Sequence, residues 1–319
     1  MKKKAFITGI NGQDGSYLSE YLLGLDYDVF GIVRRNSIAE HQESRIDHLV
    51  GNGVHTEYGD LLDVSSLERM IRTIKPDEIY NIAAQSHVRI SMDIPQFTVQ
   101  TNTIGLLNIL EAYKNNYPKA RFYQASSSEM FGDVLEAKQK ESTPLNPQSP
   151  YAISKVFSHF LTQNYRNSYG LFATSGILFN HESPLRSKEF VTKKIVDTAL
   201  KIKRNKNIIL RLGNVEIVRD WGWAPDYVRA IWLMMQRNKP RDFIIGSGKT
   251  YSLKDFVNEV FKYLDISKKN LKTNVSKYKR KVDLRGYKAN IADTQKILKW
   301  KPKLKFKTII HKMINNELF

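Results

Sequence analysis

The sequence predicts an α/β fold in which a doubly wound parallel sheet is joined to a smaller C-terminal lobe. Two observations support this prediction. From the N-terminus to Phe179, short apolar runs alternate with amphipathic helical stretches, a pattern typical of βαβ units. The runs are almost continuously apolar, as expected for strands of a parallel sheet that is covered on both faces.

The predicted elements follow one another in a regular order. Strands are expected at residues 5–8, 29–33, 56–59, 78–84, 121–127 and 173–179, and helices at residues 16–25, 65–74, 99–114 and 150–168. Beyond Phe179 the pattern is irregular, with one further helix expected near residues 191–203. We predict a Rossmann-type domain of residues 1–179 with a returning segment near 215–247, and a substrate-binding lobe of residues 180–214 and 248–319.

The composition excludes several classes of site. The 319 residues include no cysteine, so a disulfide scaffold, a thiolate metal site and a cysteine nucleophile are excluded. The formal charge of +18 is compatible with binding to nucleic acid. However, the basic residues are scattered except at residues 267–281, and no nucleic-acid-binding signature accompanies them. We therefore favour a lysine-rich surface that attracts small anions, with no nucleic-acid partner and no metal.

No leader or membrane segment is expected. The N-terminal lysines are followed by only three apolar residues, too few for the core of a signal peptide. The longest apolar runs, such as residues 230–235, are too short to span a bilayer. We therefore expect a cytoplasmic protein.

A glycine-rich turn follows the first predicted strand and opens the first helix. Gly9, Gly12 and Gly15 are spaced G-x-x-G-x-x-G, one residue longer in the first interval than the usual dinucleotide-binding fingerprint. Glycines allow the backbone to approach a pyrophosphate, and the helix N-terminus presents N–H groups to it. The turn therefore predicts a bound nucleotide.

Two arginines indicate which nucleotide binds. An NAD site usually has an acidic residue at the end of the second strand, where it binds the ribose 2′-hydroxyl. This chain has Arg34 and Arg35 there, and a guanidinium suits a 2′-phosphate. We therefore predict NADP as the cofactor, with Asp60, after the third strand, placed to meet the adenine amino group.

A tyrosine and a lysine lie one helical turn apart. Tyr151 and Lys155 occur at i and i+4 of the segment "SPYAISK", with Ser149 as the expected N-cap and Pro150 at the first helical position. A lysine on the same helix face stabilises the phenolate form of the tyrosine. Tyr151 can then act as a base near neutral pH.

A carboxylate accompanies this pair. The segment "ASSSEMFG" places Ser127 and Glu129 at the carboxyl end of the fifth predicted strand, where open α/β sheets carry their active sites. A simple dehydrogenase needs only a hydroxyl and a tyrosine. The added glutamate offers a second acid/base, as abstraction of a proton α to a carbonyl would require.

The chain resembles the extended short-chain dehydrogenase/reductases and, within them, the GDP-mannose 4,6-dehydratase family. The glycine loop and the Tyr/Lys pair match the superfamily, whereas "GILFNHESP" is specific to the dehydratases. The matching segments are, in order, "TGINGQDGSYL", "GIVRRNS", "YGDLLD", "YNIAAQSHV", "ASSSEMFG", "SPYAISK", "GILFNHESP", "FVTKKI" and "RDWG".

The resemblance implies a reaction. Tyr151, assisted by Lys155, takes the proton of the sugar C4 hydroxyl while a hydride moves from C4 to NADP+. The 4-ketone acidifies C5, from which Glu129 removes a proton as water leaves C6. Hydride then returns to C6, and the cofactor is regenerated in each turnover. The predicted enzyme is a hydro-lyase that converts GDP-mannose to GDP-4-keto-6-deoxymannose, with the hydroxyl of Ser127 bonded to the C4 oxygen.

The resemblance also implies the binding residues. Besides the residues already named, the cofactor would contact Asn11, Gln13, Asp14, Leu61, Ala83, Gln85, Ser86, His181 and Arg186. The GDP-sugar would contact Ser86, Glu129, Asn180, Lys194, Arg219 and either Arg280 or Arg285.

Departures from the family pattern lie on the substrate side. Leu185 stands where the family has an arginine, and Trp223 stands where it usually has a histidine. GDP-N-acetylglucosamine and a GDP-heptose therefore remain open as substrates. A related epimerase or 4-keto reductase is a second alternative. A third is a binding module with an inactive cofactor site, which the complete catalytic set of Ser127, Glu129, Tyr151 and Lys155 argues against.

Two predicted helical stretches carry apolar faces. Residues 99–114 and 150–168 could form an intersubunit four-helix bundle, as in the superfamily. We therefore expect a homodimer or a homotetramer.

Overall fold

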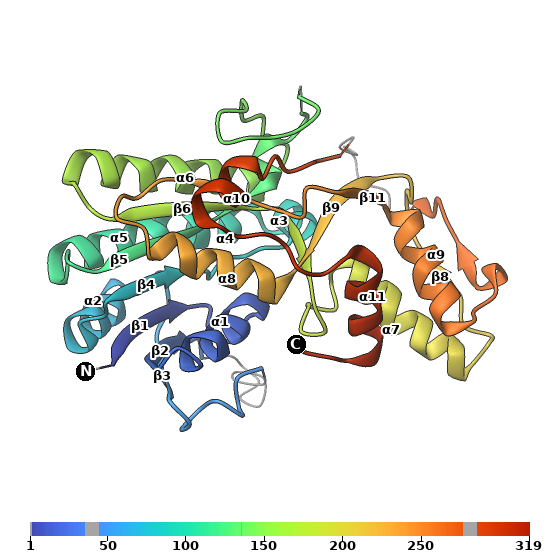
Figure 1. Cartoon of the computed structure of the whole chain (residues 1–319), viewed down its shortest axis with the longest axis horizontal. Helices are drawn as coiled ribbons and strands as arrows, with labels where there is room; N and C mark the ends of the chain where they lie inside the picture. Colours follow the sequence, from blue (N-terminus) through green and yellow to red (C-terminus); the bar gives the residue numbers. More distant parts are fainter. Residues whose placement is uncertain (1, 36–44, 135, 277–285) are drawn as a thin grey trace. The chain divides into compact units, whose positions relative to one another are not determined.

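The computed structural model describes residues 2–35, 45–134, 136–276 and 286–319 (Figure 1). The chain divides into two compact units. Unit 1 comprises Met1–Met130, Ser149–Leu178 and Val228–Phe243. Unit 2 comprises Phe131–Gln148, Phe179–Tyr227 and Ile244–Phe319. Predicted residues Arg280 and Arg285 lie outside the described ranges.

A seven-stranded sheet in the order β10-β6-β5-β4-β1-β2-β3 confirms the predicted doubly wound fold. The pairs from β3 to β6 are parallel. The first six strands agree with the sequence prediction in number and order. The strands are β1 (Lys3–Thr8), β2 (Tyr27–Val33), β3 (Val54–Tyr58), β4 (Glu78–Asn81), β5 (Arg121–Ser127), β6 (Ala173–Leu178) and β10 (Phe243–Ile245).

Helices cover both faces of this sheet. On one face, α2 (Val64–Ile74), α5 (Gly105–Asn116) and α6 (Pro150–Tyr169) bury side chains in one core with Phe6, Ile79 and Phe122. On the other face lie α1 (Gln13–Leu23) and α8 (Ala224–Met235). There the rings of Tyr21 and Trp232 meet edge to face, 5.8 Å apart.

The helix predicted at residues 99–114 is a composite. Its first part belongs to α4 (Pro95–Val99), which follows the short α3 (Val88–Asp93). A turn of π-helix, η2 (Gln100–Ile104), then leads into α5. Single π-turns of this kind often occur at functional sites because the extra residue alters which side chains face inward.

Unit 2 contains two small sheets and its own core. One sheet joins β7 (Asn180–Glu182), β9 (Val218–Trp223) and β11 (Thr250–Ser252), and the other joins β8 (Leu210–Arg211) to β12 (Leu271–Lys272). Three amphipathic helices bury their apolar faces in one cluster that includes Trp221 and Trp223. They are α7 (Val191–Arg204), α9 (Leu253–Leu264) and α11 (Phe306–Asn315), while α10 (Ala292–Leu298) is shorter.

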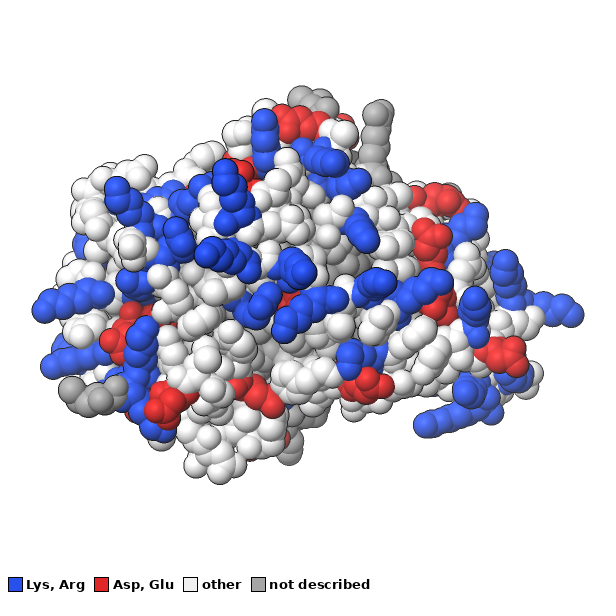
Figure 2. All heavy atoms as spheres, in the orientation of Figure 1, with Lys and Arg blue, Asp and Glu red and all other residues white. Residues whose placement is uncertain are grey.

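Basic side chains are distributed over the visible face with acidic ones among them (Figure 2). This distribution agrees with the excess of 50 Lys and Arg over 32 Asp and Glu in the sequence. None of the described helices is both long enough and apolar enough to cross a membrane.

Candidate functional site

The glycine loop joins β1 to α1 in a backbone shape that side chains would not permit. Gly9 has a φ of +73°, and a Cβ there would lie 2.8 Å from the nitrogen of Ala83. A Cβ on Gly15 would lie 2.3 Å from the carbonyl oxygen of Gly9. The three predicted glycines thus lie together, and Gly12 forms the N-cap of α1 without a side-chain cap. This arrangement leaves the helix N-terminus open to an anionic group.

Other predicted cofactor residues surround this loop. Arg45 Nη1 donates to the carbonyl of Asn11 at 3.2 Å, and Gln13 Nε2 donates to Asp14 Oδ1 at 3.1 Å. Arg34 and Arg35 follow β2 directly and are exposed. Their position after β2 is the one that the sequence predicted.

The loops after β3 and β4 are tied down by side chains. Asp60 Oδ1 accepts from the backbone N–H of Leu62 at 2.8 Å, and the Leu61 carbonyl accepts from Asn108 at 2.8 Å. Gln85 is half-buried, and its Oε1 has no hydrogen-bond partner among the described residues. Ser86, next to it, is exposed.

The tyrosine and the lysine lie on the first turns of α6. Ser149 caps this helix by accepting from the N–H of Ala152 at 3.1 Å, as the sequence predicted. Tyr151 and Lys155 are both buried, and Lys155 Nζ lies 5.9 Å from the centre of the Tyr151 ring. Lys155 Nζ donates to the carbonyl oxygen of Ala125 on β5 at 2.8 Å. Burial lowers the pKa of Lys155 from 10.5 to about 8.

Ser127 and Glu129 lie at the carboxyl end of β5. Ser127 is the last residue of the strand, and Glu129 falls in the short 3-10 helix η3 (Ser128–Phe131). The backbone N–H of Glu129 donates to Ser127 Oγ at 3.2 Å. Lys155 is bonded to the same strand, at Ala125. The structure therefore brings the predicted hydroxyl, carboxylate and Tyr/Lys pair together at the β5–α6 edge of unit 1.

Sequence reasoning missed Asn102, a residue that supports this site. Asn102 Oδ1 accepts from the backbone N–H of Gln85 at 2.9 Å, and its Nδ2 donates to Ser154 Oγ at 2.9 Å. Its carbonyl accepts from Ser158 Oγ at 2.9 Å. Asn102 thus joins the loop after β4 to the catalytic helix. Asn102 stands in the polar run at residues 100–103 of the sequence, so its residue type did not distinguish it from its neighbours.

Sequence reasoning also missed His159, which contacts the residue before Ser127 on β5. The imidazole of His159, one turn beyond Lys155, contacts Ser126 Oγ through Nδ1 at 3.1 Å and Gln163 Nε2 through its own Nε2 at 3.0 Å. Asp242 Oδ2 lies 3.9 Å from His159 Nε2 and is held by Arg166 at 2.9 Å. Burial lowers the pKa of His159, since the charged imidazolium would be desolvated.

The remaining predicted residues belong to unit 2. His181 is buried, with Nδ1 2.8 Å from the carbonyl of Phe179 and its ring 4.5 Å from that of Tyr227. Arg186 Nε lies 3.4 Å from Glu182 Oε2. Asn180, Lys194 and Arg219 occur on β7, α7 and β9 respectively. Arg219 is buried, and its guanidinium lies 5.1 Å from the centre of the Tyr287 ring.

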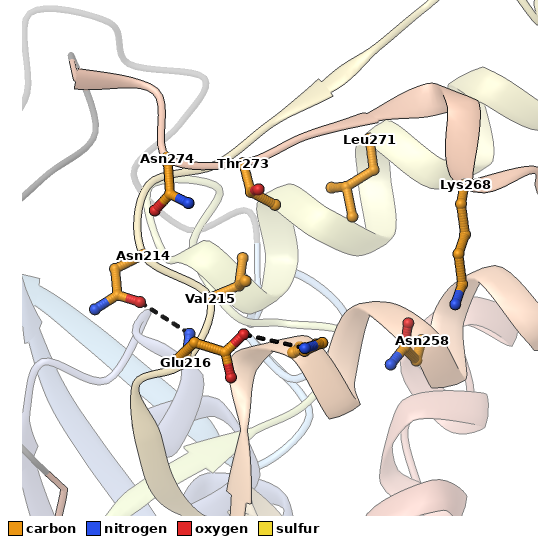
Figure 3. A pocket seen from close by; sticks show the side chains of 9 residues that line it. Asn214, Val215, Glu216, Asn258, Lys268, Leu271, Thr273 and Asn274 are labelled. Atoms are coloured by element: carbon orange, nitrogen blue, oxygen red, sulfur yellow. Dashed lines mark hydrogen bonds and ion pairs between the residues drawn. The ribbon is translucent and has the colours of Figure 1, made fainter.

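A cavity of about 260 Å³ also lies in unit 2 (Figure 3). Glu216 in its wall forms an ion pair with Lys254 at 3.2 Å. None of the predicted substrate residues that the structure describes lines it. The lining residues are Asn214, Val215, Glu216, Lys254, Asn258, Lys268, Leu271, Thr273 and Asn274.

Comparison with known proteins identifies the family. A family model described as GDP-mannose 4,6 dehydratase matches residues 6–313. The chain belongs to this family. GDP-mannose 4,6 dehydratase 1 of Arabidopsis thaliana is 42% identical over 99% of this chain and 90% of its own length. The GDP-mannose 4,6-dehydratase of Yersinia enterocolitica is 49% identical over 80% of this chain and 70% of its own length.

Solved structures confirm the predicted fold. A dTDP-glucose 4,6-dehydratase of Streptomyces venezuelae, solved with NAD bound, has a TM-score of 0.88 at 23% identity. It matches 98% of this chain and 96% of its own. UDP-glucose 4-epimerase of Thermotoga maritima has a TM-score of 0.86 at 22% identity over 98% and 97%. The predicted family and hydro-lyase class are thus confirmed by the sequence relatives.

Proposed function

We propose that this member of the family converts GDP-mannose to GDP-4-keto-6-deoxymannose. The observation that carries the proposal is the position of Glu129 directly after β5, the strand that ends at Ser127 and that bonds to Lys155 of the Tyr/Lys pair. Oxidation or reduction at C4 requires one acid/base, whereas elimination of water across C5 and C6 requires a second. Glu129 supplies that second group.

The glycine loop fits a nicotinamide dinucleotide. Side chains are excluded at Gly9 and Gly15, and α1 begins without a side-chain cap, so its first N–H groups face the place where a pyrophosphate would lie. The buried Gln85 Oε1, without a partner among the described residues, suits a hydroxyl or amide donor of the cofactor. A dinucleotide held by Gly9, Gly15 and the start of α1 would supply the hydride acceptor and donor for the sugar.

Arg34 and Arg35 support NADP over NAD. Both are exposed after β2, where a guanidinium can bind the 2′-phosphate. Calorimetric titration of the chain with each dinucleotide tests this choice. We expect NADP to bind at least about tenfold more tightly, and the Arg34→Ser variant to lose most of that preference. Equal affinities of the unmodified chain would contradict the assignment.

Tyr151 and Lys155 act at C4. Tyr151 takes the proton of the C4 hydroxyl, and the buried ammonium of Lys155, 5.9 Å from the ring centre, stabilises the resulting phenolate. The ammonium can do this because it is held by a neutral carbonyl, that of Ala125, at 2.8 Å. Ser127, at the end of β5, holds the C4 oxygen through its hydroxyl.

Glu129 acts at C5 and C6. Its carboxylate removes the C5 proton, which the adjacent ketone has acidified, and delivers a proton to the departing C6 hydroxyl. C5 regains a proton from the solvent through the same carboxylate as hydride returns to C6. Its half-buried position in η3 keeps the carboxylate accessible to a sugar at the strand ends. The backbone bond from Glu129 to Ser127 Oγ fixes the spacing between the groups that act at C5 and C4.

Unit 2 supplies the GDP-binding residues in this proposal. Asn180, Lys194 and Arg219 on its strands and helix α7 would contact the nucleotide sugar. Trp223, a departure from the family pattern, is buried in the core cluster of unit 2. A panel of GDP-mannose, GDP-N-acetylglucosamine and a GDP-heptose decides the hexose. We expect the highest kcat/KM for GDP-mannose.

The decisive experiment follows product and cofactor together. The chain is incubated with NADP+ and GDP-mannose, and we expect a 4-keto-6-deoxy product without net accumulation of NADPH. Glu129→Gln should abolish product formation and leave the fold intact, while Glu57→Gln, an exposed change on β3, should leave the rate unchanged. Full activity of Glu129→Gln would refute the assigned role, and stoichiometric consumption of NADPH would indicate a reductase.

We further propose a cytoplasmic homo-oligomer that pairs through an apolar face of unit 1. Ile153, Phe157 and Phe160 are exposed at i, i+4 and i+7 of α6. Phe97 and Ile104, on the neighbouring α4 and η2, are exposed as well. Contiguous exposed apolar side chains of this kind often mark interfaces between proteins. A second copy of the chain would cover the patch, as the predicted homodimer or homotetramer requires.

A further inference from the structure

Three polar side chains form a buried row across the middle of the seven-stranded sheet. Thr8, Asn81 and Gln124 are register partners on the adjacent strands β1, β4 and β5. All three are at least 98% buried. Strands buried on both faces normally carry apolar residues at such positions. A polar row at this depth is costly unless its groups are mutually bonded.

The row forms a continuous chain of hydrogen bonds. Thr8 Oγ1 donates to Asn81 Oδ1 at 2.6 Å, and Asn81 Nδ2 donates to Gln124 Oε1 at 2.7 Å. Gln124 Nε2 then donates to the carbonyl oxygen of Ala125 at 3.1 Å. That same carbonyl accepts the ammonium of Lys155 at 2.8 Å. The row therefore begins beside the glycine loop and ends at the group that holds the catalytic lysine.

A backbone group fixes the direction of the whole chain. The carbonyl of Ala125 can only accept, so the Gln124 amide must turn its nitrogen towards it and its oxygen towards Asn81. Asn81 must then donate through Nδ2 to Gln124, which leaves its Oδ1 to accept the proton of Thr8. Thr8 Oγ1 in turn accepts from the N–H of Ala83 at 3.3 Å. A flipped Gln124 would oppose two donors at Asn81 and two acceptors at Ala125.

The carbonyl at the end of the chain lies just past the pairing between β4 and β5. Asn81 and Gln124 form the last pair of these two strands, so Ala125 comes one residue beyond it, although Ala125 still pairs with Gly176 on β6. Its carbonyl has two lone pairs. One receives Gln124 Nε2 and the other receives Lys155 Nζ. The ammonium thus has a fixed, neutral acceptor whose position depends on the Gln124 amide.

We propose that Gln124 is a positioning residue for Lys155: its amide, bonded in line with Asn81 and Thr8, holds the Ala125 carbonyl that places the ammonium beside Tyr151. The inference rests on the proposed function for the catalytic role of Lys155. An amide suits this task because it anchors the ammonium indirectly and brings no charge. A carboxylate at the same place would pair with the ammonium and weaken its effect on the Tyr151 phenolate.

The test measures the titration of Lys155 itself in the protein without cofactor. Lysines are labelled with ¹³C at Cε, the signal of Lys155 is assigned by its loss in Lys155→Met, and its pKa is read from the shift of the signal with pH. Gln124→Glu should raise the pKa of Lys155 by about one to two units, the effect of an opposite charge close by. Asn164→Asp adds the same charge at an exposed site on α6 and should leave that pKa unchanged.

A second variant guards against a failure of Gln124→Glu to fold. Gln124→Met keeps the length of the side chain but removes its donor, so the carbonyl is no longer held. The ammonium then loses its fixed acceptor, and the pKa of Lys155 should fall by at least about 0.5 units. A titration of Lys155 that is identical in the folded Gln124 variants and the unmodified chain would overturn the proposal. If the pKa of Lys155 shifts in the Gln124 variants but the unmodified chain yields no product from any nucleotide sugar, the proposed function fails while the positioning role stands.

Discussion

Replacement of Lys155 by methionine should abolish activity and yet stabilise the folded chain at neutral pH. In the native state, burial lowers the pKa of Lys155 from 10.5 to about 8. This difference in pKa means that the charged ammonium destabilises the native state by about 3 kcal/mol relative to the neutral amine. Methionine fills a similar volume without the charge. Loss of the bond to Ala125 offsets about 1 kcal/mol, so the net gain should be about 2 kcal/mol at pH 7.

The pH dependence gives the prediction its sign. Below pH 8 the lysine is protonated in both states, and the native state carries the full cost. Between pH 8 and 10.5 the native lysine loses its proton while the unfolded one keeps it, so the unmodified chain gains up to about 1.4 kcal/mol per pH unit. The methionine variant lacks this term. Its advantage over the unmodified chain should therefore shrink as pH rises through this window.

Urea unfolding followed by circular dichroism measures this difference. Both proteins are unfolded at pH 7 and pH 10, and the differences in unfolding free energy are compared, so that groups common to both proteins cancel. We expect the methionine variant to be more stable at pH 7 and nearly equal at pH 10. A variant that is less stable at pH 7, by an amount that does not change with pH, would refute the account of a charged, desolvated lysine.

Three further predictions concern other parts of unit 1. Gly15→Ala should lower the free energy of unfolding by more than about 2 kcal/mol and abolish dinucleotide binding, because its Cβ would lie 2.3 Å from the Gly9 carbonyl oxygen. Gly24→Ala, whose Cβ would lie 3.4 Å from the nearest atom, should leave the free energy of unfolding in urea unchanged. Equal losses in the two variants would contradict this reasoning. Burial lowers the pKa of His159 in the native state, despite Arg166 and Asp242 nearby, so the chain should lose stability as pH falls below about 6.5. Urea unfolding at pH 5 and pH 7 measures this loss, which should be smaller in His159→Asn. An equal loss of unfolding free energy in both proteins would count against the prediction. Phe157→Glu, on the exposed face of α6, should halve the mass measured by light scattering, and an unaltered mass would place the interface elsewhere.

The features predicted well are those that depend on short stretches of sequence. The first six strands along the chain, the glycine loop and the capped Tyr/Lys helix each follow from local pattern, and the structure has them where the pattern indicated. The strand β10 was missed because three residues carry too little signal for a strand. The π-turn η2 was read as ordinary helix because one extra residue in a single turn leaves no distinct pattern in five residues.

The supporting contacts could not be predicted because they join residues far apart in the chain. Lys155 bonds to a carbonyl 30 positions away, and Asn102 contacts Ser154 across 52 positions. His159 and Asp242 meet only after β6 and α8 have been placed. From the sequence alone, each of these polar side chains could equally well be exposed to solvent. Only the register of the strands and the packing of α6 bring them to the site.

The central claim is that one hydride leaves C4 and returns to C6 of the same sugar while Glu129 exchanges the C5 proton. Incubation of the chain with NADP+ and GDP-mannose carrying deuterium at C4 tests it most directly, with the product examined by mass spectrometry and NMR. We predict that the deuterium appears at C6 and, when unlabelled GDP-mannose is incubated in D₂O, that C5 carries a deuterium from the solvent. Deuterium retained at C4, accumulated in the dinucleotide or lost to water would contradict the account.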